Sequence, residues 1–229
     1  MDRRHTDREY EGELETLRER VLMMGARVEE MLNHSMHAYL ARDIEEARST
    51  IDLDRIIDQL EIEIDQMSLQ ILARRQPVAS DLRFITTILK LVTDLERMGD
   101  LGVNLCERVV ELGSDPRPNE NDPIKRIAEV ALGMIHDSLD AFVAGDFHKA
   151  EQVIERDRVV DAYYAQLFPE LVTAMMTNPS LVYSSTRLLS IGKYLERLAD
   201  HATNIAEMVV FMVKGQDVRH SGPSHAPTS

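Results

Sequence analysis

The second half of this 229-residue chain repeats the residue pattern of the first half, and this repeat restricts the fold more than any other feature. At an offset of 103, the matched positions are Ser35 and Ser138, Asp43 and Asp146, Asp54 and Asp157, and Asp58 and Asp161. At an offset of 100, they are Leu95 and Leu195, Glu96 and Glu196, Asp100 and Asp200, and Asn104 and Asn204. Such a repeat predicts two similar units packed together.

Each copy has the hydrophobic period of α-helices, and residues 10–112 show almost no strand-like alternation. Helix boundaries are expected at Asp43, Gln76-Pro77, Asp122-Pro123, Gly145-Asp146 and Asn178-Pro179. The pattern predicts an all-α fold of six long helices, arranged as two tandem three-helix bundles related by internal duplication. The expected units are residues 1–112 and 122–215, with a linker at 113–121 and a disordered tail at 216–229.

Composition restricts the partners and the compartment. The 40 acidic and 26 basic residues give a net charge of −14, which repels nucleic acid and anionic lipid, so neither is expected as a direct partner. The single cysteine, Cys106, permits no internal disulfide, as is typical of the reducing cytosol. The first residues contain no signal-peptide core, and no apolar run is long enough to span a bilayer. A cytoplasmic protein without membrane insertion is expected.

Pairs of acidic residues spaced four apart recur in both copies. Because a helix turns about 100° per residue, Glu96, Asp100 and Asn104 lie within about 80° of one another. The matching set is Glu196, Asp200 and Asn204, and further pairs on the preceding helices are Asp54 with Asp58 and Asp157 with Asp161. Like charges at this spacing destabilise an exposed helix by a few tenths of a kcal/mol. A helix gains nothing from such pairs unless a cation neutralises them.

The residues next to the acids offer little compensation. Arg97 and Arg197 each follow a glutamate directly, so we expect them to point about 100° away from the acids. Val92 and Val103 lie within about 40° of Glu96, which predicts that the acids are partly buried. A buried carboxylate needs a partner or a proton.

The hairpin geometry brings the acid pairs to one level. If the chain turns near Pro77, Asp58 and Glu96 each lie about 19 residues, or roughly 28 Å, from the turn. Residues Asp161 and Glu196 are placed similarly around Asn178. All-oxygen ligands suit hard cations such as magnesium, calcium, manganese or iron. We therefore predict a metal site in each copy, with the ligands Asp54, Asp58, Glu96 and Asp100, and Asp157, Asp161, Glu196 and Asp200.

Nearby polar residues are assigned less directly. Glu61 and Asp65 are expected at the surface, because the second copy has Tyr164 and Phe168 at these positions. Asn104 and Asn204 could support the metal ligands by hydrogen bonds, or could bond between helices. His201 adjoins Asp200 and is expected to be a surface residue rather than an outer ligand.

Two other functions stay open at this stage. In a plain helical scaffold without metal, the acids would be solvated surface, as most charged helix faces are. A metal-dependent enzyme would need an acid–base group beside an open metal position, and no such group repeats beyond the acids. The sequence also lacks the Glu-x-x-His, His-Glu-x-x-His and glycine-rich phosphate-binding motifs.

Two segments resemble the PhoU family. PVASDLRFITTILKLVTDLERMGDLGVNL (residues 77–105) and LLSIGKYLERLADHATNIAEMVVFMVKG (residues 188–215) are similar to the two LERIGD-type signatures of that family. Each contains an acid-x-x-x-Asp metal motif, here Glu96 with Asp100 and Glu196 with Asp200. The resemblance covers about residues 10–214. The second segment has Ala199 where glycine is common, so a small residue is kept.

The resemblance implies a fold of two similar three-helix bundles side by side, and metal sites holding iron, zinc or other divalent ions. It also implies a cytoplasmic, often dimeric, non-enzymatic adaptor. Its partners would be the ATPase subunit of the ABC phosphate transporter and a membrane sensor histidine kinase. Such an adaptor would restrain phosphate uptake and repress the phosphate-starvation response when phosphate is plentiful.

Overall fold

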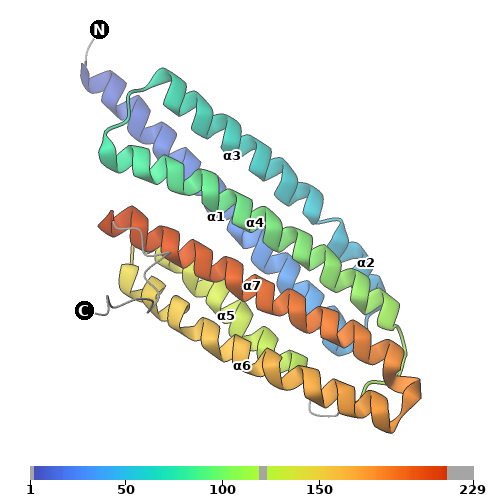
Figure 1. The fold of residues 1–229 in the computed structure, drawn as a ribbon. Coiled ribbons are helices and arrows are strands. Elements are labelled where there is room, and N and C mark those ends of the chain that lie inside the picture. The colour runs from blue at the N-terminus through green and yellow to red at the C-terminus, as the bar shows by residue number, and fades with distance from the viewer. Residues whose placement is uncertain (1–2, 119–122, 216–229) are drawn as a thin grey trace, which may run out of the picture.

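A computed structural model describes residues 3–118 and 123–215, and within these ranges the chain is helical and has no strand (Figure 1). The α-helices are α1 (Arg3–Ala41), α2 (Ile44–Ile51), α3 (Asp54–Arg74), α4 (Ala79–Leu112), α5 (Pro123–Ala144), α6 (Phe147–Thr177) and α7 (Val182–Lys214), and a short 3-10 turn, η1, spans Pro179–Leu181. None of the described helices is both long and apolar enough to cross a membrane. The predicted all-α fold is confirmed, with α2 and α3 standing where the sequence predicts one long helix.

The break between α2 and α3 has a local cause. The Ser49 and Thr50 hydroxyls donate to the backbone oxygen of Glu46, at 3.0 and 2.7 Å. Hydroxyl groups that bond back to the preceding turn bend helices. The backbone N–H of Asp52 then bonds to the oxygens of Ser49 and Thr50, so the helix tightens here before it resumes at Asp54.

The predicted boundaries at Asp43 and Asp146 are confirmed. Asp43 caps α2 by accepting a hydrogen bond from the Glu46 N–H, and Asp146 caps α6 in the same way. Each aspartate follows a residue with left-handed backbone, at φ +57° for Arg42 and +62° for Gly145. The side chain of Asn178 accepts from the Ser180 N–H and begins η1. The predicted cap at Asp122 and the predicted tail at 216–229 lie outside the described residues.

The two bundles share one hydrophobic core. Helices α1–α4 form the first bundle and α5–α7 the second, and they meet where α4 packs on α7 and α1 packs on α5 (Figure 1). Helix α4 runs antiparallel to α7, because Asp94 bonds to His201 whereas Glu111, further along α4, bonds to Arg187, nearer the start of α7. Leu95 and Leu195, the leucines of the two signatures, are both 0% exposed within this core.

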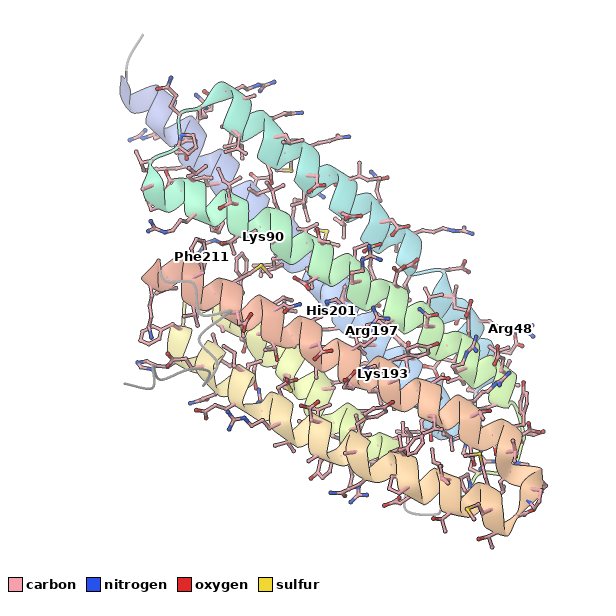
Figure 2. All side chains as sticks on the ribbon, in the orientation of Figure 1. Arg48, Lys90, Lys193, Arg197, His201 and Phe211 are labelled. Carbon is pink, nitrogen blue, oxygen red and sulfur yellow. The ribbon has the colours of Figure 1, made fainter. Side chains whose placement is uncertain are left out.

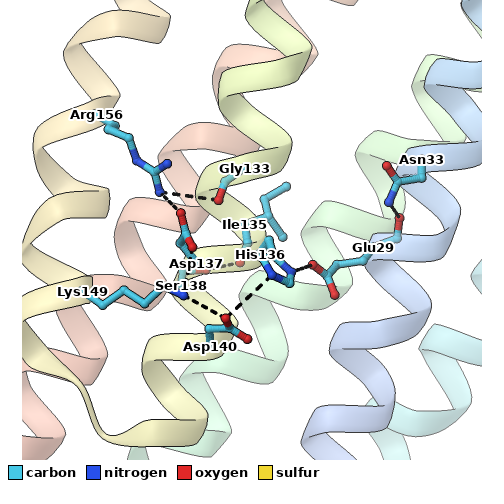
Figure 3. A network of polar contacts seen from close by, with 10 residues as sticks. All are labelled: Glu29, Asn33, Gly133, Ile135, His136, Asp137, Ser138, Asp140, Lys149 and Arg156. Atoms are coloured by element: carbon cyan, nitrogen blue, oxygen red, sulfur yellow. Dashed lines mark hydrogen bonds and ion pairs between the residues drawn. The ribbon is translucent and has the colours of Figure 1, made fainter.

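A polar network joins the bundles on the α1–α5 side (Figure 3). His136 of α5 bonds to the Glu29 carboxylate of α1 at 2.9 Å and lies 3.7 Å from Asp140. Lys149 of α6 connects Asp140 to Asp137, which also pairs with Arg156. The hydrogen bond to Glu29, followed by the charge of that carboxylate, raises the pKa of His136.

The Glu29–His136 pair predicts a small pH dependence of stability. Because the folded state raises the pKa of His136, its contribution is complete below the unfolded pKa of about 6.5 and is lost as pH rises through the folded value. We expect His136→Gln to lower the free energy of unfolding by up to about 0.5 kcal/mol at pH 6 and by less at pH 8, since the ring is largely exposed. Urea unfolding at both pH values measures this. In a Glu29→Gln background, His136→Gln should have the same effect at both pH values. A loss of stability that grows with pH would contradict the prediction.

Two candidate metal-binding clusters

The predicted ligands of the first copy lie together between α3 and α4. The carboxylate of Asp54, at the start of α3, packs on α4 at Gly99, where an added β-carbon would lie 3.1 Å from the Asp54 Oδ1 atom. Burial, followed by the charges of Asp58, Asp100 and Glu96, raises the pKa of Asp54 to about 6. The four carboxylates are therefore close enough to repel one another. They are called cluster one below.

The second copy repeats this arrangement between α6 and α7. Burial, followed by the charges of Asp161, Asp200 and Glu196, raises the pKa of Asp157 to about 6. Burial and the charge of Glu196 likewise raise the pKa of Asp200. These four carboxylates are called cluster two. The sequence-based placement of the eight acids in two facing sets is thus matched by the folded chain.

Each cluster has a buried part and an exposed part. The side chain of Glu96 is only 22% exposed, as the flanking Val92 and Val103 predict, and that of Glu196 is 15% exposed. Asp58 and Asp161 are exposed to solvent. Among the described residues, no three His, Cys, Asp or Glu side chains already converge as metal ligands do. A cation would therefore have to draw the exposed carboxylates toward the buried glutamates.

The expectation that the signature arginines point away from the acids is wrong for Arg97. Its guanidinium lies 3.5 Å from Glu96 and 3.6 Å from Asp100. The arginine side chain is long and flexible enough to reach acids that lie about one helical turn away. Angles between Cα positions around the helix axis do not include this reach. In cluster two the cation is a lysine that the sequence analysis missed: Lys193 Nζ donates a hydrogen bond to Glu196. The spacing of three residues between them is the signal that would have identified it.

The prediction that Glu61 lies at the surface is also wrong. Glu61 is partly buried on α3, and burial, followed by the charges of Asp65 and Asp58, raises its pKa. The charge of Glu61 in turn contributes to the raised pKa of Glu96, after burial and Asp100. Glu61 therefore lies beside cluster one as a fifth carboxylate.

The side chains of the two asparagines and His201 bond to groups other than the carboxylates of the two clusters. Asn104 Nδ2 donates to the backbone oxygen of Asp100 at 2.7 Å. Asn204 Nδ2 and His201 Nδ1 both bond to Asp94 Oδ1, at 3.1 and 2.7 Å, and so connect α7 to α4. His201 is only 16% exposed, so it is an inter-bundle contact and not a surface residue. Figure 2 labels His201, Arg197 and Lys193 along α7.

Comparisons with known proteins agree with the repeat and the fold. The family model described as PhoU domain matches residues 21–109 and 124–209, one segment in each copy. The phosphate-specific transport system accessory protein PhoU homolog of Pseudomonas putida is 38% identical over 221 residues, covering 95% of this chain and 86% of that protein. The corresponding protein named PhoU in Escherichia coli K12 is 33% identical over 219 residues, covering 96% of this chain and 91% of that protein.

Two solved structures superpose closely on the chain. The crystal structure of PhoU from Pseudomonas aeruginosa has a TM-score of 0.87 at 37% identity and covers 90% of this chain and 100% of its own. The structure titled phosphate transport system regulatory protein PhoU from Streptococcus pneumoniae has a TM-score of 0.84 at 31% identity, with coverage of 91% and 99%. The chain belongs to the PhoU family.

Proposed function

We propose that this chain is the regulatory accessory protein of a phosphate-specific transport system, which restrains phosphate uptake and represses the phosphate-starvation response while phosphate is abundant. The observation that carries the proposal is the match to proteins of that name over both repeats, with nearly full coverage on each side. It acts by contact with other proteins and not by catalysis.

The proposed partners are the ATPase subunit of the ABC phosphate transporter and a sensor histidine kinase, both met in the cytoplasm. The net charge of −14 favours association with basic protein surfaces. We also propose a homodimer. Exposed apolar side chains on α6, Phe168 at 57% and Met176 at 81%, are consistent with a protein contact on that helix.

We propose that the two clusters hold hard cations, such as magnesium, manganese, calcium or iron, with zinc as a further candidate. The donors fit such ions because they are all carboxylate oxygens and already lie within range of mutual repulsion. Gly99 leaves the space that brings Asp54 onto α4. A bound cation would neutralise each cluster. In cluster one it would connect α3 to α4, and in cluster two α6 to α7, so that each pair of helices would be held together as a docking surface.

The test is reporter expression from a phosphate-starvation promoter in a strain that lacks this gene, grown in abundant phosphate. We expect high expression without the gene, silence when the wild-type chain is supplied, and incomplete silencing by Glu96→Gln/Glu196→Gln. The matched control is Glu129→Gln, an acid on α5 that is 65% exposed and outside both clusters. Silence in the deletion strain itself would contradict the proposed function.

A second candidate is a scaffold without metal, and the contacts of Arg97 and Lys193 with the acids favour it, because these side chains partly neutralise the clusters. Metal content of the purified full chain separates the two. Metal in the wild type and in Glu129→Gln, with little in Glu96→Gln/Glu196→Gln, would reject the scaffold. Equal, negligible content in all three would reject the metal.

A further inference from the structure

We infer that the two clusters are inequivalent: cluster one takes up a divalent cation first, and Lys193 closes cluster two until the cation displaces it. The inference rests on the proposed metal binding and concerns side chains that the internal repeat does not share.

The first observation is the lysine of cluster two. Lys193 Nζ donates to Glu196, whose side chain is only 15% exposed, and lies over the Tyr164 ring, 5.7 Å from its centroid. The ring of Tyr164 packs beside Gly192 on α7, where an added β-carbon would meet it at 3.4 Å. The ammonium is therefore held between a carboxylate and an aromatic face. A cation that uses Glu196 must break this contact.

Cluster one has no such lysine, because the position that matches Lys193 is Thr93. Its own basic residue, Arg97, is 57% exposed, against 48% for Lys193, and lies 3.5 and 3.6 Å from the acids, farther than the hydrogen-bonded contact of Lys193. An exposed ion pair at that separation contributes little. A divalent cation therefore displaces Arg97 more easily than it displaces Lys193.

The second observation is the carboxylate that only cluster one gains. Asp54, Asp58 and Glu61 lie at positions i, i+4 and i+7 of α3, which is one stripe of a helix. The residue that follows Asp157 by seven on α6 is Tyr164. Cluster one thus presents five carboxylates against one guanidinium at 3.5 and 3.6 Å, whereas cluster two presents four carboxylates against a hydrogen-bonded ammonium. Both differences favour the divalent cation at cluster one.

The test is a titration of the chelator-treated full chain with manganese chloride at pH 7, in which the magnetic resonance signal of free Mn²⁺ gives the bound amount. We expect two phases in the wild type: Glu96→Gln should remove the tighter one and Glu196→Gln the weaker one. Lys193→Thr, which supplies the residue of copy one, should tighten the weaker phase about tenfold. Glu61→Gln should weaken the tighter phase by a similar factor.

The control is Lys125→Thr, which removes another partly exposed lysine that pairs with a glutamate, at 3.9 Å on α5, and should change neither phase. Lys193→Gln, checked for helix content, repeats the test with a better helix former. Two phases of equal affinity, or no effect of either Lys193 variant, would overturn the inference and leave metal binding in place. No Mn²⁺ binding by any form would overturn the inference together with the proposed metal sites.

Discussion

Replacing Leu195 with alanine should lower the free energy of unfolding by about 3 to 5 kcal/mol, the largest single-residue stability loss that we expect. Leu195 is 0% exposed, and its helix, α7, packs against α4, α5 and α6. A cavity surrounded by several helices cannot collapse easily, so the loss should lie near the upper range for buried leucine. The measurement is urea unfolding followed by far-ultraviolet circular dichroism at pH 7.

The matched control is Leu69→Ala on α3. Leu69 is 59% exposed, so the same chemical change should cost no more than about 0.5 kcal/mol. Equal small losses for both variants would show that α7 does not form the packed centre of the two bundles. A loss for Leu195→Ala with an unchanged dependence on urea concentration would show that both bundles still unfold together.

The fold could be predicted because the internal repeat, the hydrophobic period of the helices and the capping residues all indicate the same helix boundaries. Asp43 and Asp146 mark equivalent helix starts at an offset of 103, and the structure caps both helices with these side chains. The break before Asp54 could not be predicted from the period, because it depends on hydroxyl groups bonding back to the helix backbone. Such bonds leave the hydrophobic pattern unchanged.

The grouping of the acids could be predicted because the spacing of residues along a helix fixes their angle around the axis and their height along it. The contacts between helices could not be predicted in this way. His201 and Asp94 are 107 residues apart and meet only because α7 lies antiparallel to α4 with a particular rotation. The two copies also differ more than a strict repeat predicts. The sequence places Glu61 at the surface because its match is Tyr164, but in the folded chain Glu61 lies beside cluster one, whereas the Tyr164 ring lies under Lys193 in cluster two.

Without metal, Asp54 and Asp157 should contribute less to stability as pH rises through their titration. Burial, followed by the charges of the neighbouring acids, raises the pKa values of Asp54 and Asp157 to about 6, against 3.8 for an exposed aspartate, so the folded chain binds more protons between these values. The contribution of these two carboxylates to the free energy of unfolding must therefore fall as pH rises from about 4 to about 7. A pKa shift of this size corresponds to about 3 kcal/mol in the free energy of unfolding per carboxylate when the group is fully shielded from water. Because both carboxylates are partly exposed, we expect about 1 kcal/mol from each.

The variant Asp54→Asn/Asp157→Asn isolates these two groups from the other acids, since asparagine resembles the protonated form at every pH. In chelator at pH 7, we expect the variant to be about 2 kcal/mol more stable than the wild type, and at pH 4 the difference should disappear. A variant that is less stable than the wild type at pH 7, or a difference that does not change with pH, would contradict the repulsion within the clusters. Glu129→Gln is again the exposed control.

Adding a divalent cation at pH 7 should reverse this order. A bound ion at a hundred times its dissociation constant stabilises a folded chain by about 2.7 kcal/mol. Metal should therefore raise the free energy of unfolding of the wild type above that of the variant, which lacks one carboxylate in each cluster. At pH 4 the same cation should have little effect, because protons then occupy the carboxylates that it needs. Repulsion that is unfavourable in the empty chain is thus the feature that makes stability depend on the cation. If metal stabilised the wild type and the variant equally, the cation would be acting outside the two clusters.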